Sequence, residues 1–197
     1  MSRIYPTYDE CRCYVVLTDV FGLENITLSD KPDVIFDDKK FGIEIVSALS
    51  EDVHKVNTYF ENLKDEKNKP VLPKTAKEIS TGFVIGPDDN TESDIRKINE
   101  MICVKRQKKN NYEKTEKIGL YITSYLTESP DIDVNDICSK IYKDNTDEFN
   151  FIIFEFLNNG PQIVCCYGDK INIINIADQD YIMGKKAEEM YICKNNF

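Results

Sequence analysis

The chain has 197 residues, of which 41% are hydrophobic and 30% are charged, so it contains enough apolar material for a core. This length predicts a single domain over residues 1–197. Every apolar run is shorter than the roughly 18–20 residues that cross a bilayer, so we expect no membrane partner. The net charge of −10 argues against broad, sequence-independent DNA binding, which needs a basic surface.

The N-terminus and the cysteines favour a cytoplasmic protein. The first ten residues do not combine a basic stretch with an apolar one, so we expect no signal peptide. Seven cysteines show no C-x-x-C spacing and His54 is the only histidine, so the usual zinc patterns are absent. We therefore expect reduced thiols, several of them buried as small apolar groups.

The order of the expected elements is typical of a mixed α+β (α/β) domain, with a central sheet flanked by helices. Apolar spacing and turn residues define these elements, with Gly22 as a typical helix end. A core over residues 8–125 is followed by a strand-rich part over 134–197. In chain order we expect helix 9–22, strands 33–37 and 40–47, helix 50–64, a Lys-rich loop 64–80, strand 82–85, helix 91–112, strand 119–125, helix 134–142, and strands 151–157, 162–167 and 171–176.

The segment 32–47 predicts a hairpin that turns at residues 38–39. Side chains alternate between the two faces of a strand, so pairing about that turn gathers apolar side chains on one face and the charged ones on the other. A shift of one residue would bury the charges, which is a reason for this register. The opposed pairs are Phe36 with Phe41, Val34 with Ile43, and Asp33 with Glu44.

The pair Asp33 and Glu44 predicts a cation site. Opposed residues have Cβ atoms about 4.5–5.5 Å apart, and two carboxylates that close repel unless one is protonated or a cation lies between them. Mg²⁺ prefers such oxygen ligands, and a divalent ion activates water. Gly42, beside the pair, would leave room for a substrate backbone. The alternative is a surface hairpin whose polar face is merely solvated.

Pro32-Asp33, followed after a short run by Phe41-Gly42-Ile43-Glu44-Ile45, resembles the PD-(D/E)XK nuclease superfamily. More narrowly, residues 8–47 resemble bacterial and phage-associated proteins with a "PDF…GIEVT" core. The resemblance implies a restriction-endonuclease-like fold and a nuclease that binds Mg²⁺ or Mn²⁺. It also implies metal ligation by Asp33, Glu44 and the backbone carbonyl of Ile45, with an extra acidic residue from the N-terminal helix, for which we favour Glu10.

The chain departs from this family at Val46, where the family has a catalytic lysine. Several branches of the superfamily carry that lysine on the following helix. Here residues 95–117 hold eight Lys or Arg and three Glu, a local net charge of +5. The apolar stripe of helix 91–112 continues into Lys105, which we expect to assist catalysis, with Lys108 and then Lys109 as further choices. The alternative is a solvated basic helix whose lysine stems lie on the core.

Two functions follow from these residues. The first is a metal-dependent nuclease that hydrolyses phosphodiester bonds of DNA or RNA. The second is a catalytically inactive nuclease-like binding module, an immunity, inhibitor or regulatory protein that binds a basic protein partner by electrostatic steering. Val46 and a sequence pI near 4.7 favour the second function. A lysine within reach of Asp33 and Glu44 would favour the first.

Overall fold

The structure is a computed structural model that describes residues 6–37, 39–48, 76–79, 82–85, 91–108, 115–124, 133–157 and 161–195. The described helices are α1 (Tyr8–Asp19), α3 (Thr91–Lys108), α4 (Val134–Lys143) and α5 (Ala177–Asn195). The described strands are β1 (Thr27–Leu28), β2 (Val34–Phe36), β3 (Phe41–Ser47), β4 (Ala76–Ile79), β5 (Gly82–Ile85), β6 (Lys117–Ser124), β7 (Phe151–Phe156), β8 (Gln162–Tyr167) and β9 (Lys170–Asn175).

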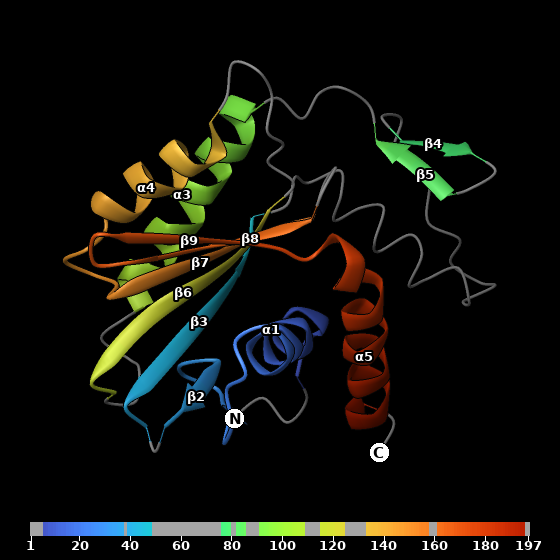
Figure 1. Cartoon of the computed structure of the whole chain (residues 1–197), viewed down its shortest axis with the longest axis horizontal. Coiled ribbons are helices and arrows are strands. Elements are labelled where there is room, and N and C mark those ends of the chain that lie inside the picture. The colour runs from blue at the N-terminus through green and yellow to red at the C-terminus, as the bar shows by residue number, and fades with distance from the viewer. Residues whose placement is uncertain are drawn as a thin grey trace.

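A seven-stranded mixed sheet in the order β1-β2-β3-β6-β7-β8-β9 forms the centre of the described part, and β4 and β5 form a separate hairpin. In the seven-stranded sheet, β3, β6 and β7 run parallel. The strands on either side of these three pair antiparallel with their neighbours. Parallel neighbours need a crossover connection. Helices α3 and α4 lie in these two crossovers and cover one face of the sheet, while α1 and α5 cover the other face (Figure 1).

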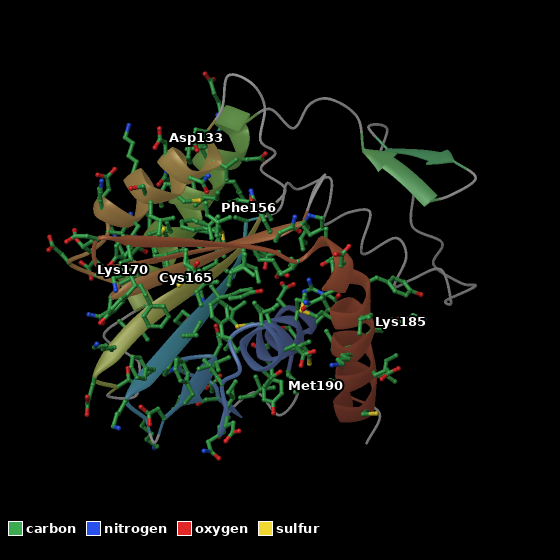
Figure 2. The ribbon with its side chains drawn as sticks, in the orientation of Figure 1. Asp133, Phe156, Cys165, Lys170, Lys185 and Met190 are labelled. Atoms are coloured by element: carbon green, nitrogen blue, oxygen red, sulfur yellow. The ribbon has the colours of Figure 1, made fainter. Side chains whose placement is uncertain are left out.

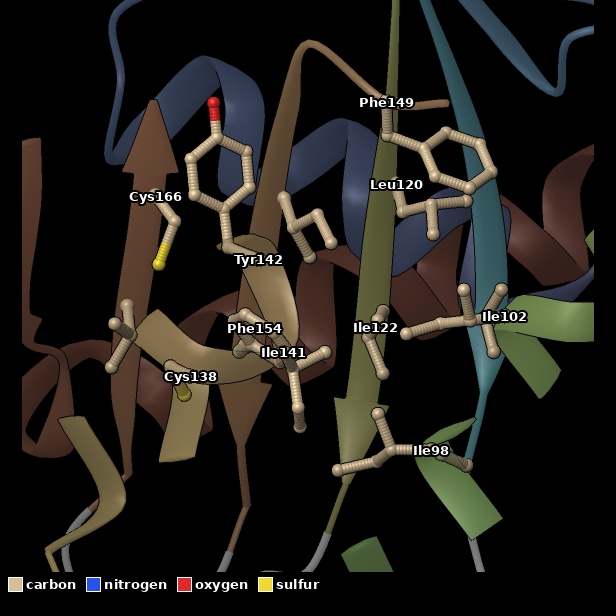
Figure 3. Close-up of a cluster of buried hydrophobic side chains, with 14 of the residues drawn as sticks. Ile98, Ile102, Leu120, Ile122, Cys138, Ile141, Tyr142, Phe149, Phe154 and Cys166 are labelled. Carbon is tan, nitrogen blue, oxygen red and sulfur yellow. The ribbon is translucent and has the colours of Figure 1, made fainter. Parts of the chain in front are cut away.

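Two apolar layers hold this sandwich together. On one side, Ile98 and Ile102 of α3 and Ile141 of α4 pack on Leu120 and Phe154 of the sheet (Figure 3). On the other side, a second layer joins α1, α5 and the opposite faces of the same strands. Side chains therefore occupy both faces of the sheet (Figure 2). A sheet covered on both faces needs strands that are apolar throughout, and every residue of β7 is buried.

Helix α1 begins and ends at recognisable signals. At its start, Thr7 and Glu10 form a capping box: the Glu10 N–H donates to Thr7 Oγ1 at 3.2 Å, and the Thr7 N–H donates to Glu10 Oε2 at 2.6 Å. After its end, Gly22 has φ of +63°, a conformation that glycine adopts without strain. The predicted helix end at Gly22 is thus three residues beyond the last helical residue.

The predicted hairpin register is confirmed. Strand β2 pairs with β3 through Val34 with Ile43 and Phe36 with Phe41, and these apolar side chains pack toward α1. The alternative of a merely solvated polar face is wrong at Glu44, whose side chain is only 4% exposed. The face that carries Glu44 is covered by α3, so the carboxylate sits in a buried layer rather than in bulk water.

Some expected elements differ from the structure. No helix was expected after residue 176, yet α5 follows β9 directly, and β1 was also missed. Part of the expected loop 64–80 is strand β4. The predicted helix 50–64 lies outside the described residues, together with His54. All seven cysteines are free thiols, and no helix in the described segments is long and apolar enough to span a bilayer.

Candidate functional site: an acidic pair bridged by a lysine

Three elements bring Asp33, Glu44 and Lys105 together. Asp33 directly precedes β2, Glu44 lies in the middle of β3, and Lys105 lies in the last turn of α3. Because α3 packs its buried Ile98 and Ile102 on the sheet, the same stripe carries Lys105 over β3. The lysine thus reaches the acidic pair, as its place on the apolar stripe predicts.

One ammonium group contacts both carboxylates. The Lys105 Nζ donates to Asp33 Oδ2 at 3.3 Å and also to Glu44 Oε2, so it forms an ion pair with each residue. The backbone N–H of Ile45 donates to the same Asp33 oxygen at 2.7 Å. Asp33 is therefore oriented by two donors, one from the strand that carries Glu44 and one from the helix.

The three side chains lie at the boundary between the core and the surface. Their exposed fractions are 4% for Glu44, 15% for Lys105 and 16% for Asp33. Burial by itself lowers the pKa of Lys105, but the charges of Asp33 and Glu44 and their hydrogen bonds outweigh it, so this pKa is raised. The lysine stays charged, and the fully ionised group has a net charge of −1.

The sequence predicted like-charge repulsion that only protonation or an added cation would relieve. The structure shows that the chain supplies its own cation in Lys105. Two carboxylates that one cation touches are also a suitable donor set for Mg²⁺, which is usually bound by one or two carboxylates with several waters. Asp33 and Glu44 therefore fit a divalent ion by their chemistry.

The other predicted site residues are either engaged elsewhere in the structure or not tested by it. The Glu10 carboxylate caps α1, and in the described part of the chain no three His, Cys, Asp or Glu side chains are grouped to hold a metal ion. Lys108 is exposed one turn beyond Lys105, and Lys109 lies outside the described residues. The Ile45 carbonyl stays a predicted ligand. One oxygen of Glu10 is thus engaged in the capping box of α1.

Gly42 does not leave room for a substrate, contrary to expectation. A Cβ built at this position would lie 2.5 Å from Cγ of Pro32 and 3.1 Å from side-chain atoms of Ile118 and Thr115. The chain itself therefore fills the space above Gly42. The glycine instead allows the Pro32 ring to pack closely on β3, directly before Asp33. Gly42 thus helps to fix where the Asp33 carboxylate lies.

A second charged cluster, missed in the sequence, lies on the opposite face of the sheet. Arg12 of α1 donates through Nε to Glu155 Oε1 at 2.8 Å, and its Nη2 lies 2.5 Å from Asp180 Oδ1 of α5. Tyr121 donates to Glu155 Oε2 at 2.5 Å. The sequence held one signal for this cluster: Glu155 is a lone carboxylate within an apolar strand. Since a buried charge needs a partner, a buried cation could have been expected beside it.

Burial and the charges of neighbouring groups shift the pKa values of Glu155, Tyr121 and Arg12 in this second cluster. Burial raises the pKa of Glu155, which is 0% exposed, although Arg12 and Tyr121 counteract the shift. Burial and the nearby Glu155 charge also raise the pKa of Tyr121. For Arg12, burial is outweighed by Glu155, so its pKa is raised and it stays charged. Arg12 and Glu155 form a buried ion pair, and Asp180 adds a second, partly exposed carboxylate to the same guanidinium.

No family model, no curated protein and no solved structure matches this chain. The resemblance to the PD-(D/E)XK superfamily therefore rests on the motif residues alone. Function has to be inferred from the chemistry of the described side chains, above all Asp33, Glu44 and Lys105.

Proposed function

We propose that the protein is a metal-dependent nuclease of PD-(D/E)XK type, with a restriction-endonuclease-like fold, that hydrolyses phosphodiester bonds of DNA or RNA. The observation that carries the proposal is the contact of Lys105 Nζ with both Asp33 and Glu44. Val46 stands where the family has its motif lysine, and Lys105 from helix α3 contacts the acidic pair instead. This is the relocation that branches of the superfamily use.

Each residue has a distinct role in this proposal. Asp33 and Glu44, with the Ile45 carbonyl, would hold Mg²⁺ or Mn²⁺, which supplies an activated water and stabilises charge on the phosphate. The Ile45 N–H orients the Asp33 carboxylate at 2.7 Å. Lys105 stabilises the negative charge that develops on the phosphate during hydrolysis. Glu44 lies on a strand, Lys105 lies on a packed helix, and Asp33 is held by the Ile45 N–H, so the geometry of the three side chains is preorganised.

A second candidate function is a nuclease-like binding module without activity. The observation that favours it is the same contact of Lys105 with the two carboxylates. Lys105 already neutralises part of their charge, and the Glu44 side chain is only 4% exposed. A net charge of −10 would steer such a module toward a basic protein partner. The two functions differ in whether Lys105 and the carboxylates act on a substrate.

A cleavage assay separates the two functions. Wild-type protein is incubated with mixed single- and double-stranded DNA and RNA in Mg²⁺, in Mn²⁺ or in EDTA. The nuclease proposal predicts metal-dependent cutting, a loss of about 10²–10³-fold in turnover for Lys105→Met, and a loss at least as large for Glu44→Gln. Glu100→Gln is a matched control, because Glu100 is an exposed acid on α3.

The outcome that defeats the nuclease proposal is a folded wild-type protein that cuts none of these substrates with either metal. Cutting that Glu44→Gln and Glu100→Gln retain equally would also defeat it, because the activity would then come from another site or from a contaminant. The binding module would then be the better account.

A further inference from the structure

We propose that Lys105 is a tethered counter-ion, which occupies the cation position between Asp33 and Glu44 until a divalent metal ion displaces it. This inference rests on the proposed function in one respect, namely that the site takes a divalent metal ion. It adds a regulatory step, because the same lysine cannot serve the acidic pair and a substrate phosphate at once. Metal binding would therefore release the lysine for the substrate.

The geometry places the ammonium where a metal ion would have to bind. Lys105 Nζ contacts Asp33 Oδ2 and Glu44 Oε2, so one cation reaches an oxygen of each carboxylate. A metal ion that is ligated by both residues must come within about 2.0–2.1 Å of their oxygens. A divalent ion and an ammonium group that share these oxygens repel each other strongly in a poorly solvated site.

The surroundings show how Lys105 could leave without unfolding the site. Its side chain is 15% exposed, so the ammonium lies near the surface, while Glu44 is 4% exposed. Asp33 keeps the Ile45 N–H as a donor when the lysine moves. The lysine side chain is a flexible chain of four carbons with a compact charge, and it changes partners without moving the helix.

The direction of exchange follows from charge. Two carboxylates attract a divalent ion more strongly than an ammonium ion, because the divalent ion carries twice the charge. Lys105, however, is covalently tethered and is present at a high local concentration, so it weakens metal binding. Wild-type affinity for Mg²⁺ or Mn²⁺ should thus be lower than the carboxylates alone would give.

Calorimetric titration with Mn²⁺, and then with Mg²⁺, tests the inference without any activity assay. We expect Lys105→Met to bind Mn²⁺ about tenfold tighter than wild type or better, because the variant lacks the competing cation. Lys105→Arg keeps the charge and should bind no tighter than wild type. Lys108→Met, which removes an exposed lysine from the same helix, is the matched control and should differ by less than about twofold.

A second measurement follows the lysine itself and does not depend on a variant that folds. Reductive methylation of the wild-type protein, read by mass spectrometry, should label Lys105 slowly in EDTA and several-fold faster in saturating Mg²⁺. Lys186, which pairs with Asp19 at the surface, should be labelled at the same rate in both conditions.

The results distinguish failure of the inference from failure of the proposed function. If wild type binds metal and cuts, but Lys105→Met binds no tighter and labelling of Lys105 is unchanged, the counter-ion role is wrong and the nuclease proposal stands. If only Lys105→Met binds metal, Lys105 is a counter-ion that no metal ion displaces, so the exchange is wrong and the nuclease proposal falls with it. If neither protein binds either metal, both proposals are overturned.

Discussion

The sheet carries a charged cluster on each of its two faces, and in each cluster a single cation contacts two carboxylates. Under α3, Lys105 contacts Asp33 and Glu44. Between α1 and α5, Arg12 contacts Glu155 and Asp180. Lys105 lies 72 and 61 residues from its two carboxylates, and Arg12 lies 143 and 168 residues from its own. The nature of the cation and its other partners also distinguishes the two clusters.

The arginine cluster is saturated. Arg12 is 5% exposed and uses its planar guanidinium to hold two carboxylates and the Asp180 carbonyl, while Tyr121 takes the remaining Glu155 oxygen. Such a fork has no substitute among simple ions. Lys105, by contrast, presents a point charge near the surface, which an ion can replace. The comparison therefore leads us to expect that the first cluster exchanges its cation and that the second keeps it.

The largest expected effect is in the arginine cluster. Arg12→Met leaves Glu155 charged and buried without its cation, so we expect a loss of about 3–5 kcal/mol in the free energy of unfolding. Urea denaturation followed by circular dichroism measures this loss. The double variant Arg12→Met/Glu155→Leu should recover a large part of it, because no buried charge remains. An Arg12→Met protein within about 1 kcal/mol of wild type would mean that the ion pair is not needed.

The next effect concerns Gly42. A Cβ at this position would meet the Pro32 ring at 2.5 Å, so Gly42→Ala should cost about 1–3 kcal/mol of stability through overpacking. We also expect weaker Mn²⁺ binding, since Pro32 adjoins Asp33. Gly184→Ala is the control, because its nearest atoms lie at 3.6 Å and 3.8 Å and helical alanine is favourable. Unchanged stability and Mn²⁺ affinity in Gly42→Ala would show that the Pro32 ring can move aside at no cost, which would contradict its role in positioning Asp33.

Lys105→Met should cost less stability than Arg12→Met, on the order of 2 kcal/mol, because Asp33 and Lys105 reach solvent. Urea denaturation in EDTA measures this cost. In saturating Mg²⁺ the variant should regain most of it, because the ion replaces the ammonium and stabilises the folded state by binding. Arg12→Met should gain no more from Mg²⁺ than wild type does. If Lys105→Met gains nothing from Mg²⁺, the cation is not exchangeable.

Tyr121→Phe should give the smallest loss, about 1.5 kcal/mol, because it removes one hydrogen bond to a charged group. This loss should depend on pH. Burial and Glu155 raise the pKa of Tyr121 above its usual value of 10.0 in the folded state. Above about pH 10 the unfolded chain therefore loses this proton first, and the stability advantage of wild type over Tyr121→Phe shrinks. Urea denaturation of both proteins between pH 8 and pH 11 measures this change. A difference in unfolding free energy between wild type and Tyr121→Phe that stays constant over this range would contradict the prediction.

Local periodicity was enough to predict one cluster but not the other. The alternation of the hairpin placed Asp33 opposite Glu44, and the helical stripe of α3 placed Lys105 above them, so short-range patterns defined the site. Arg12 and Glu155 are 143 residues apart, and no pattern links them. Only the packing of α1 on the sheet reveals their contact.

Two further features were hidden for physical reasons. Helix α5 buries a narrow stripe of Met183 and Ala187, with Gly184 between them, so its apolar period was too weak to recognise. The packing of Pro32 on Gly42 depends on the path of the chain before β2, which the alternation of the strands does not encode. Long-range contacts and irregular segments thus account for what the sequence did not predict.

Calorimetric titration with Mn²⁺ of wild type, Glu44→Gln and Asp180→Asn tests the central claim most directly. Each variant neutralises one carboxylate, the first in the lysine cluster and the second in the arginine cluster. We predict that wild type and Asp180→Asn bind Mn²⁺ with similar affinity and that Glu44→Gln does not bind it. Unchanged binding in Glu44→Gln, or binding lost only in Asp180→Asn, would contradict the assignment of the exchangeable cation site to Asp33, Glu44 and Lys105.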